Sequence, residues 1–413
     1  MFDMGTDNLP TKTIPTRSHP PETDIGAISL YVHIPFCETK CPYCDFNTYT
    51  AIESLMPSYI SALKTEISLW GSHLGRPRVT TVFFGGGTPS YLPAADIESL
   101  LKHIRTYCDL DISGEISLEC NPGDVTRDKL SSYLDSGVNR LSIGVQSFSD
   151  SLLHLLGRRH TSSDAIHSYQ LAIESGFENV SIDLMYGLPN QTPQDWRTTL
   201  EIAREMEPAH LSMYCLTLED GTPMKKQVQI GTFPSPDADL AADMYMMCDE
   251  TFSHPDYRHY EISNWAKPGN ESVHNLTYWR NESFLGIGPG SHSYINGHRF
   301  WNIKPPREYI TRLKPCHMEP TQSTIPNIPV IDEIEPIDRK MEIAETMMMG
   351  LRLDTGICID QFSARFSVTP TKHFGSIISE LESNGLVEQS SNFIKLTAKG
   401  RLLGNEVFSS FFL

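Results

Sequence analysis

The sequence predicts an α/β protein in which strand–helix units build a parallel β-sheet, followed by a small second domain. Three observations predict this fold class. Six short apolar, β-rich runs alternate with helical patterns between residues 28 and 216. Their spacing of about 25–50 residues suits right-handed crossovers between parallel strands. The chain of 413 residues is also longer than one hydrophobic core usually fills.

The strands and helices of these units follow from the period of their apolar residues. Strands are expected at 28–34, 79–84, 115–119, 140–145, 180–186 and 210–216. Helices are expected at 57–74, 93–107, 126–137, 162–175 and 192–206. Pro57 suits a first helical turn, and Thr161 with Asp164 has the form of a capping box. Six units are fewer than a closed eight-fold barrel needs, so a six-unit partial barrel or an open parallel sheet fits better.

The segments on either side of these units differ in composition. Residues 1–27 are rich in Pro and Thr and are expected to form a disordered lead-in before the partial barrel at 28–225. Residues 226–314 break the strand–helix rhythm and are interpreted as a barrel extension. A Pro-rich linker is expected at 315–337, and residues 338–413 are expected to form a small winged-helix-like domain that ends in a hairpin.

Charge and hydropathy exclude several classes of protein. The net charge of −18, from 33 basic and 51 acidic residues, opposes the phosphate backbone and argues against a nucleic-acid partner. No apolar run approaches the length of a membrane span. The first residues lack the apolar centre of a signal peptide, so a cytoplasmic protein is expected.

Three of the nine cysteines stand together, in the segment YVHIPFCETKCPYCDFN, as Cys37, Cys41 and Cys44. An odd, unevenly spread set in a chain without a secretory signal is not a disulfide framework. The group follows directly on the first predicted strand, where a loop lets three thiolates converge. Structural zinc needs four ligands, and no second cysteine pair is present. A [4Fe–4S] cluster with three protein thiolates keeps one iron open for another ligand, so the pattern favours a cluster over zinc or inert thiols.

Polar and glycine residues recur at the expected carboxyl ends of the strands, which is where parallel α/β folds bind ligands. Each residue alone also suits a tight turn, a salt bridge or a satisfied polar group, but the set recurs along all six strands. The residues at these ends are Gly85-Gly86-Gly87-Thr88, Glu119, Gln146 with Arg158 farther on, Asp183 with Tyr186, and Ser212, Tyr214 and Leu216.

The cysteine spacing, with Tyr43 between the second and third cysteines, resembles the radical S-adenosylmethionine superfamily, whose fold is a six-unit (β/α) partial barrel. YVHIPFC, GGGTPS, GVQSF, LGRRH and IDLMYGLPNQT resemble one branch of it, the oxygen-independent coproporphyrinogen III oxidases and the HemW-type heme chaperones. The resemblance runs from residue 28 to the C-terminus and includes LRLDTGICI and LTAKGRLLGNEVF.

The resemblance implies a [4Fe–4S] cluster on the three cysteines and S-adenosylmethionine at its open iron. It implies that S-adenosylmethionine contacts Tyr31, Tyr43, Gly86 and Glu119. A second cofactor or substrate volume would be lined by Gly87, Thr88, Gln146, Arg158, Asp183 and the backbone of Leu216. An electron donor such as a flavodoxin or ferredoxin would be a partner.

Three features separate the oxidases from the chaperones. The oxidases carry a fourth cysteine where this chain has Phe46, and they have a substrate-enclosing N-terminal segment where this chain has the short lead-in. The chaperone motif HNxxYW is present as His274, Asn275, Tyr278 and Trp279. His274 is a candidate axial heme ligand and His292 a second candidate, while a structural histidine in an aromatic cluster is the alternative.

The resemblance therefore implies a heme chaperone that delivers heme to acceptor hemoproteins. A coproporphyrinogen III oxidase and a zinc-stabilised α/β binding protein remain the alternatives, and enzymatic activity is left open.

Overall fold

The computed structural model describes residues 26–253, 255–314 and 325–412. The expected disordered lead-in at 1–27 therefore lies outside the described residues except for its last two positions. Residues 315–324 of the expected linker lie outside them as well.

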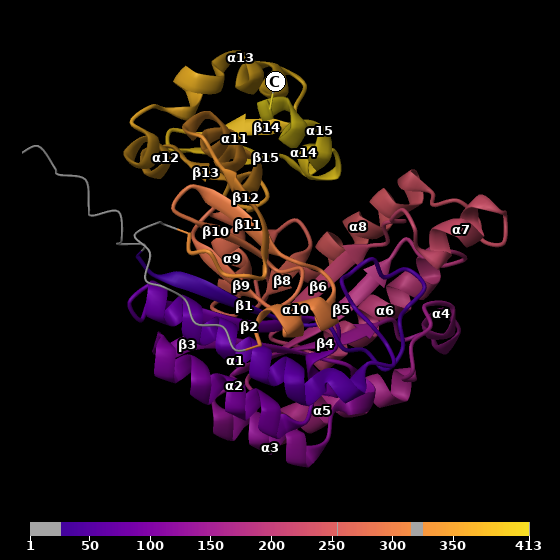
Figure 1. Ribbon diagram of the computed structural model, residues 1–413. Helices are drawn as coiled ribbons and strands as arrows, with labels where there is room; N and C mark the ends of the chain where they lie inside the picture. The colour runs from indigo at the N-terminus through magenta and orange to yellow at the C-terminus, as the bar shows by residue number, and fades with distance from the viewer. Residues whose placement is uncertain (1–25, 254, 315–324, 413) are drawn as a thin grey trace, which may run out of the picture.

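The six predicted strands are confirmed and lie side by side, in chain order and parallel, at the centre of the molecule (Figure 1). They are β1 (Ile28–Ile34), β2 (Arg78–Gly86), β3 (Asp109–Cys120), β4 (Arg140–Gln146), β5 (Asn179–Tyr186) and β6 (His210–Cys215). The helices between them are α1 (Met56–His73), α2 (Ala94–Tyr107), α3 (Arg127–Ser136), α4 (Asp150–Leu155), α5 (Ser162–Glu174) and α6 (Pro193–Met206). Pro57 lies in the first turn of α1 and the capping box of Thr161 and Asp164 begins α5, as predicted, whereas the short α4 was not predicted.

Successive residues of these strands point to opposite faces of the sheet, with irregularities at Ile28/Ser29, Val79/Thr81 and Ile143/Gln146. One face of β3, with Ile116 and Leu118, is buried in the main hydrophobic core beneath the outer helices. The opposite face carries Glu115, Ser117 and Glu119. The same alternation in the neighbouring strands lines the inner face of the partial barrel with polar side chains.

The sheet continues beyond both ends of the six-stranded unit, to twelve strands in the order β12-β11-β10-β9-β1-β2-β3-β4-β5-β6-β8-β7. The added strands are β7 (Arg258–Glu261), β8 (Asn264–Ala266), β9 (Phe284–Ile287), β10 (His292–Ile295), β11 (His298–Asn302) and β12 (Ile331–Pro336). The helices of this region are α7 (Pro223–Gln229), α8 (Ala238–Phe252), α9 (Val273–Trp279) and α10 (Pro306–Arg312).

The prediction of a linker at 315–337 is wrong for its second half. Residues 331–336 form β12, which pairs antiparallel with β11 at the edge of the sheet. Proline is tolerated there because the N–H groups on one side of an edge strand have no partner strand, and Pro336 is the last residue of β12. Proline content alone therefore did not distinguish a linker from an edge strand.

The C-terminal part is a small winged-helix-like unit with its own hydrophobic core, and it lies at the opposite end of the molecule from α1, α2 and α3 (Figure 1). Its elements are α11 (Arg339–Gly350), β13 (Ile357–Cys358), α12 (Ile359–Phe366), α13 (Pro370–Ser383), β14 (Val387–Gln389), β15 (Phe393–Leu396), α14 (Ala398–Leu402) and α15 (Gly404–Ser409). The predicted hairpin is present as β14 and β15, but two further helices follow it. None of the helices in the described ranges has the length and apolar character that a membrane crossing requires.

Candidate functional site

The cysteine loop, residues 35–49, leaves β1 at its carboxyl end and closes back on itself. Phe36 pairs with Tyr49, and the amide of Cys37 donates to the carbonyl of Tyr49 at 3.0 Å. The amide of Cys44 donates to the carbonyl of Cys41 at 3.1 Å, which turns the third cysteine back toward the second. Cys37 is 9% exposed and the other two cysteines are partly exposed.

The three thiols are near enough to one another to interact electrostatically. Burial raises the pKa of the Cys37 thiol, and the negative charges of Cys44 and Cys41 raise it further. Two donors lie against the sulfurs. Thr88 Oγ1 donates to Cys37 Sγ at 3.4 Å, and Arg158 Nη1 lies 3.7 Å from Cys41 Sγ. Such donors stabilise thiolates, the form that binds metal.

A cluster and a single metal ion make different demands on the three thiols. Within the described ranges, no three His, Cys, Asp or Glu side chains are grouped so that they could hold one metal ion. Zinc holds its sulfur ligands at about 2.3 Å around one atom. An iron–sulfur cube instead offers each cysteine an iron of its own. The position of the oxidases' fourth cysteine is taken by Phe46, whose side chain is 63% exposed.

The glycine turn after β2 lies directly against the cysteine loop. The amides of Gly87 and Thr88 donate to the carbonyls of Ile34 and Phe36 at 2.7 and 2.9 Å. Gly86 has φ +110°, and a Cβ there would lie 2.4 Å from the His33 ring. Only glycine lets the backbone come this close.

Glu119, at the end of β3, faces this turn and accepts a single hydrogen bond within the described ranges, from the Gly86 amide at 3.1 Å. Burial and the negative charge of Asp183 raise the pKa of its carboxyl to about 8. Tyr31 lies beside it. Its hydroxyl contacts His33 Nδ1 at 3.0 Å, and burial, with the charge of Glu119 as a smaller cause, raises the pKa of Tyr31. An incompletely satisfied carboxyl group with a displaced pKa marks a ligand-binding position.

Polar residues at the carboxyl ends of β4 and β5, and in the segments that follow these strands, lie beside Glu119 and the cysteine loop. Together these residues form the polar rim of the site. Ser142 Oγ donates to both carboxylate oxygens of Asp183, at 2.9 and 3.1 Å. Arg158 Nη2 donates to Asn121 Oδ1 at 2.7 Å and to the carbonyl of Gly144 at 2.8 Å. Gln146 has φ +67°, a conformation that non-glycine residues adopt mostly where structure or function requires it.

Tyr43 and Leu216 belong to a small apolar cluster beside this rim. The amide of Leu216 donates to the carbonyl of Tyr186 at 2.9 Å, so its backbone N–H is already used. The structure thus brings the predicted residues of the cysteine loop and the strand ends together at one end of the partial barrel.

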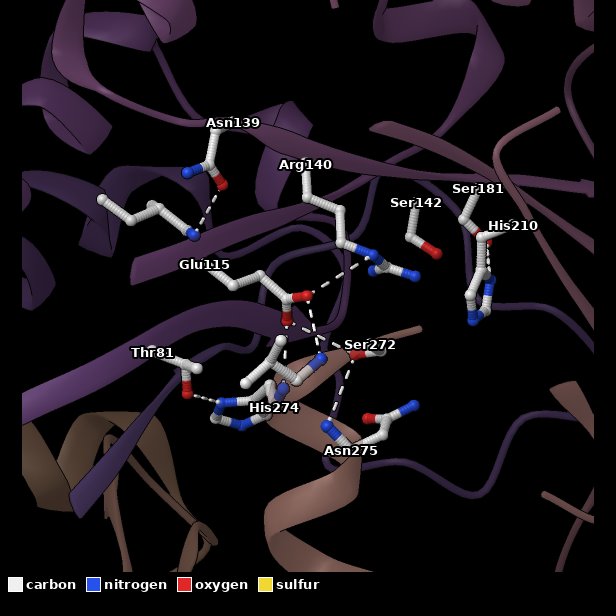
Figure 2. Close-up of polar contacts among 12 residues, drawn as sticks. Thr81, Glu115, Asn139, Arg140, Ser142, Ser181, His210, Ser272, His274 and Asn275 are labelled. Carbon is white, nitrogen blue, oxygen red and sulfur yellow. Dashed lines mark hydrogen bonds and ion pairs between the residues drawn. The ribbon is translucent and has the colours of Figure 1, made fainter. Parts of the chain in front are cut away.

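The candidate heme ligand His274 lies in a different setting, at the beginning of α9 (Figure 2). It is 1% exposed, and both ring nitrogens have partners: Nδ1 lies 2.7 Å from Thr81 Oγ1, and Nε2 lies 2.9 Å from the Tyr278 hydroxyl. Its ring stacks on Phe83, and burial lowers its pKa to about 3. In this conformation both ring nitrogens are used within the fold, as the structural alternative expects, and the axial role stays a prediction.

Sequence reasoning missed the residue that anchors α9. Glu115 accepts from the amides of Val273 and His274 at 3.0 and 3.1 Å and from Ser272 Oγ at 3.4 Å, with Arg140 Nε 3.9 Å away (Figure 2). A carboxylate at this place satisfies the first amides of the helix and its positive end. The signal was present, because Glu115 lies four residues before Glu119 and therefore on the same strand face.

The other aromatic and histidine residues predicted for heme binding also have partners within the fold. Tyr278 packs edge-on against Phe284. The guanidinium of Arg352 lies 4.4 Å from the Trp279 ring centroid. His292 is paired with Trp301, their ring centroids 5.5 Å apart, away from α9.

Comparison with known proteins agrees with this geometry. Residues 31–203 match the Radical SAM superfamily, and residues 337–403 match the HemN C-terminal domain. A solved structure titled "Coproporphyrinogen III oxidase (HemN) from Escherichia coli is a Radical SAM enzyme" superposes with a TM-score of 0.80 at 25% identity. The match covers 94% of this chain and 90% of that one. The fold and the cysteine loop together define a protein of the Radical SAM superfamily.

Closer relatives specify the branch. The protein named Heme chaperone HemW from Bacillus subtilis is 37% identical over 385 residues, which cover 93% of this chain and 98% of the relative. Radical S-adenosyl methionine domain-containing protein 1, mitochondrial, from Mus musculus is 42% identical over 272 residues, covering 66% of this chain and 62% of the relative. The chain belongs to the HemW family.

Proposed function

We propose that this protein is a heme chaperone that carries a [4Fe–4S] cluster, binds S-adenosylmethionine, and binds heme for delivery to hemoproteins. The observation that carries the proposal is the likeness to proteins named Heme chaperone HemW over nearly the whole chain. The three cysteines of the loop, without a fourth at Phe46, support it.

Cys37, Cys41 and Cys44 would hold the cluster, which supplies an open iron for a small ligand and one-electron chemistry. The residues around them fit such a group. Thr88 and Arg158 place donors against two of the sulfurs, and Gly87 lies so close to the loop that a Cβ there would come within 3.1 Å of Cys37 Sγ. An electron donor such as a flavodoxin or ferredoxin would be the redox partner.

S-adenosylmethionine would bind against Tyr31, Tyr43, Gly86 and Glu119. The Glu119 carboxyl has acceptor capacity left over for an ammonium or for ribose hydroxyls. Gly86 admits the ligand to the backbone at a point where any side chain would meet His33. Gly87, Thr88, Gln146, Arg158, Asp183 and Leu216 would border the adjoining volume.

The test is an anaerobic titration of the cluster-loaded protein with heme, followed by transfer to an apo-hemoprotein such as apomyoglobin. The proposal expects saturable binding of about one heme per chain and transfer faster than from free heme. Failure to bind heme saturably, with the cluster fully loaded, would contradict it.

One observation favours a second function. The superposition on coproporphyrinogen III oxidase extends over 94% of this chain, including the C-terminal part. Under this alternative the protein would convert coproporphyrinogen III in the presence of S-adenosylmethionine and a reductant. Detection of decarboxylated product under those conditions establishes the alternative, and a cluster-loaded protein that makes none excludes it.

A further inference from the structure

The part of the cysteine loop that follows Cys44 is joined to the barrel extension by one side chain, Asn47. Its Nδ2 donates to the carbonyl of Pro289 at 2.9 Å and to the carbonyl of Lys304 at 3.0 Å. Its Oδ1 accepts from the hydroxyl of Tyr49 at 2.9 Å. The amide group therefore has two acceptors in the extension and one donor in the loop, which fixes the loop against a distant part of the chain.

The two segments that receive this amide are themselves linked through a buried carboxyl group. Glu66 accepts from the Gly288 amide at 2.9 Å and from Asn302 Nδ2 at 2.7 Å. The amide of Gly290 also donates to the carbonyl of Ile303 at 3.0 Å. The acceptors of Asn47 therefore belong to one cross-linked platform, and not to two independent turns.

Gly290 is the residue that lets Asn47 approach this platform. It has φ +73°, and a Cβ there would lie 2.7 Å from Asn47 Nδ2. A side chain at this position would push the amide of Asn47 away from its acceptors. Gly297, in the turn between β10 and β11, has a similar φ of +71°, but a Cβ there would meet no atom closer than 3.6 Å. The two glycines thus differ in whether a side chain would reach Asn47.

The backbone of Asn47 is bonded to strand β1 on its other side. Its carbonyl lies 3.0 Å from His33 Nε2, and His33 Nδ1 lies 3.0 Å from the Tyr31 hydroxyl. A carbonyl only accepts, so Nε2 carries a proton. Burial lowers the pKa of His33 to about 4, so the ring is neutral and Nδ1 is unprotonated. Nδ1 therefore accepts, and the Tyr31 hydroxyl donates to it.

This direction of the hydrogen bonds decides what Tyr31 offers a ligand. Its only hydroxyl proton is used by His33, so the oxygen has lone pairs left and no donor. Such an oxygen suits a donor group of S-adenosylmethionine, either the ammonium or a ribose hydroxyl. A shift of the Asn47 carbonyl would release the ring of His33 and, with it, the orientation of the Tyr31 hydroxyl.

We propose that Asn47 is a positioning residue for both the cluster and S-adenosylmethionine. Its side chain holds the cysteine loop on the barrel extension, and its carbonyl, through His33, sets the direction of the Tyr31 hydroxyl. Asn47 acts through the loop and through Tyr31, and is not itself a ligand of either group. This inference rests on the proposed function, because it presupposes both the cluster and S-adenosylmethionine.

The first experiment compares the cluster-loaded full chain with its Asn47→Ala variant under anaerobic conditions. Iron loss to a ferrous chelator should be severalfold faster in the variant, because the loop opens more often. The affinity for S-adenosylmethionine, measured by isothermal titration, should fall by about fivefold, the factor that corresponds to one hydrogen bond.

Asn139→Ala is the matched control. Asn139 also bridges backbone groups, since it donates to the carbonyl of Gly114 and accepts from the amide of Ile116, each at 2.8 Å, but it lies before β4 and outside the cysteine loop (Figure 2). The control should lower the melting temperature about as much as Asn47→Ala. It should keep the wild-type rate of iron loss and the wild-type affinity for S-adenosylmethionine.

A second pair of variants tests the same contact from the barrel extension and serves if Asn47→Ala does not fold. Gly290→Ala and Gly297→Ala place a Cβ at nearly the same positive φ, so their backbone strain is similar. Only the first meets Asn47. Gly290→Ala should therefore speed iron loss and weaken S-adenosylmethionine binding, whereas Gly297→Ala should change neither.

The outcomes separate this inference from the proposed function. If wild type takes up the cluster but Asn47→Ala keeps its rate of iron loss or its affinity for S-adenosylmethionine, the positioning role is refuted and the proposed function stands. Equal changes in Gly290→Ala and Gly297→Ala would refute it as well, because strain alone would then account for them. If wild type takes up no cluster, the proposed function fails and the inference fails with it.

Discussion

Two carboxylates on the same face of β3 have opposite environments. Glu115 accepts from two helix amides and a hydroxyl and lies near Arg140, so its charge is satisfied by the protein. Glu119, four residues farther along, accepts one amide and has its pKa raised to about 8. One end of the inner barrel face is therefore filled by the protein's own helix α9, and the other is left for a ligand.

The same contrast separates the two motifs that sequence reasoning selected. The three cysteines have donors against their sulfurs but no fourth protein ligand in the loop, whereas His274 has a partner at each nitrogen. A polar group that is fully bonded within the fold stabilises the fold. One that keeps free bonding capacity in a protected position is placed for a ligand.

The largest effect is expected from the cysteine loop. Cys37→Ala, Cys41→Ala or Cys44→Ala should each reduce the iron content after reconstitution from about four atoms per chain to near zero, because two thiolates do not retain the cube. Iron and sulfide analysis checks this, with the buried Cys108→Ala as the control that keeps its iron. Full iron retention in any of the three variants would place the cluster elsewhere.

The next largest effect is expected on the stability of the fold, at the end of the inner barrel face that α9 covers. Glu115→Ala leaves the buried Arg140 without its counter-charge and the amides of α9 without their acceptor, and should lower the free energy of unfolding by about 3–5 kcal/mol. Urea denaturation followed by tryptophan fluorescence measures it. Glu388→Ala is the control, since its exposed pair with Lys395 should contribute less than about 1 kcal/mol. Equal losses in the two variants would refute the anchoring role of Glu115.

A smaller effect is expected on the affinity for S-adenosylmethionine, at the end of the inner barrel face where Glu119 lies. Glu119→Gln should weaken S-adenosylmethionine binding by about 1.5–3 kcal/mol, the range for a hydrogen bond to a charged group, with little change in iron content. Isothermal titration of the cluster-loaded protein measures the affinity. An unchanged affinity would remove Glu119 from the site.

The last prediction is a pH dependence of stability. Because the pKa of Glu119 is raised to about 8 from its ordinary value of 4.5, the folded state holds a proton that the unfolded state releases. This contribution is fully present below about pH 4.5 and is lost as the pH rises toward 8. Asp183 and Arg140 act on the same carboxyl. Ligand-free wild type should lose stability across this window more steeply than Glu119→Gln, and parallel profiles from urea titrations would contradict the assignment.

The sequence predicted the parts that depend on local patterns. The alternation of apolar residues gave the six strands, and the spacing of Cys37, Cys41 and Cys44 gave the loop. The role of His274 could not be predicted in this way, because its partners Thr81 and Glu115 lie 193 and 159 residues away in the chain. The edge strand β12 was missed for the same reason, since pairing with β11 overrides a proline-rich composition.

The central claim is that three cysteines hold a cluster with one iron open to S-adenosylmethionine. Electron paramagnetic resonance of the reduced cluster, recorded with and without S-adenosylmethionine, tests it most directly. The account predicts a cluster spectrum that changes on addition of S-adenosylmethionine, with a weaker response in Glu119→Gln at the same concentration. A spectrum that stays the same at saturating S-adenosylmethionine, or a fourth protein ligand on the cluster, would contradict it.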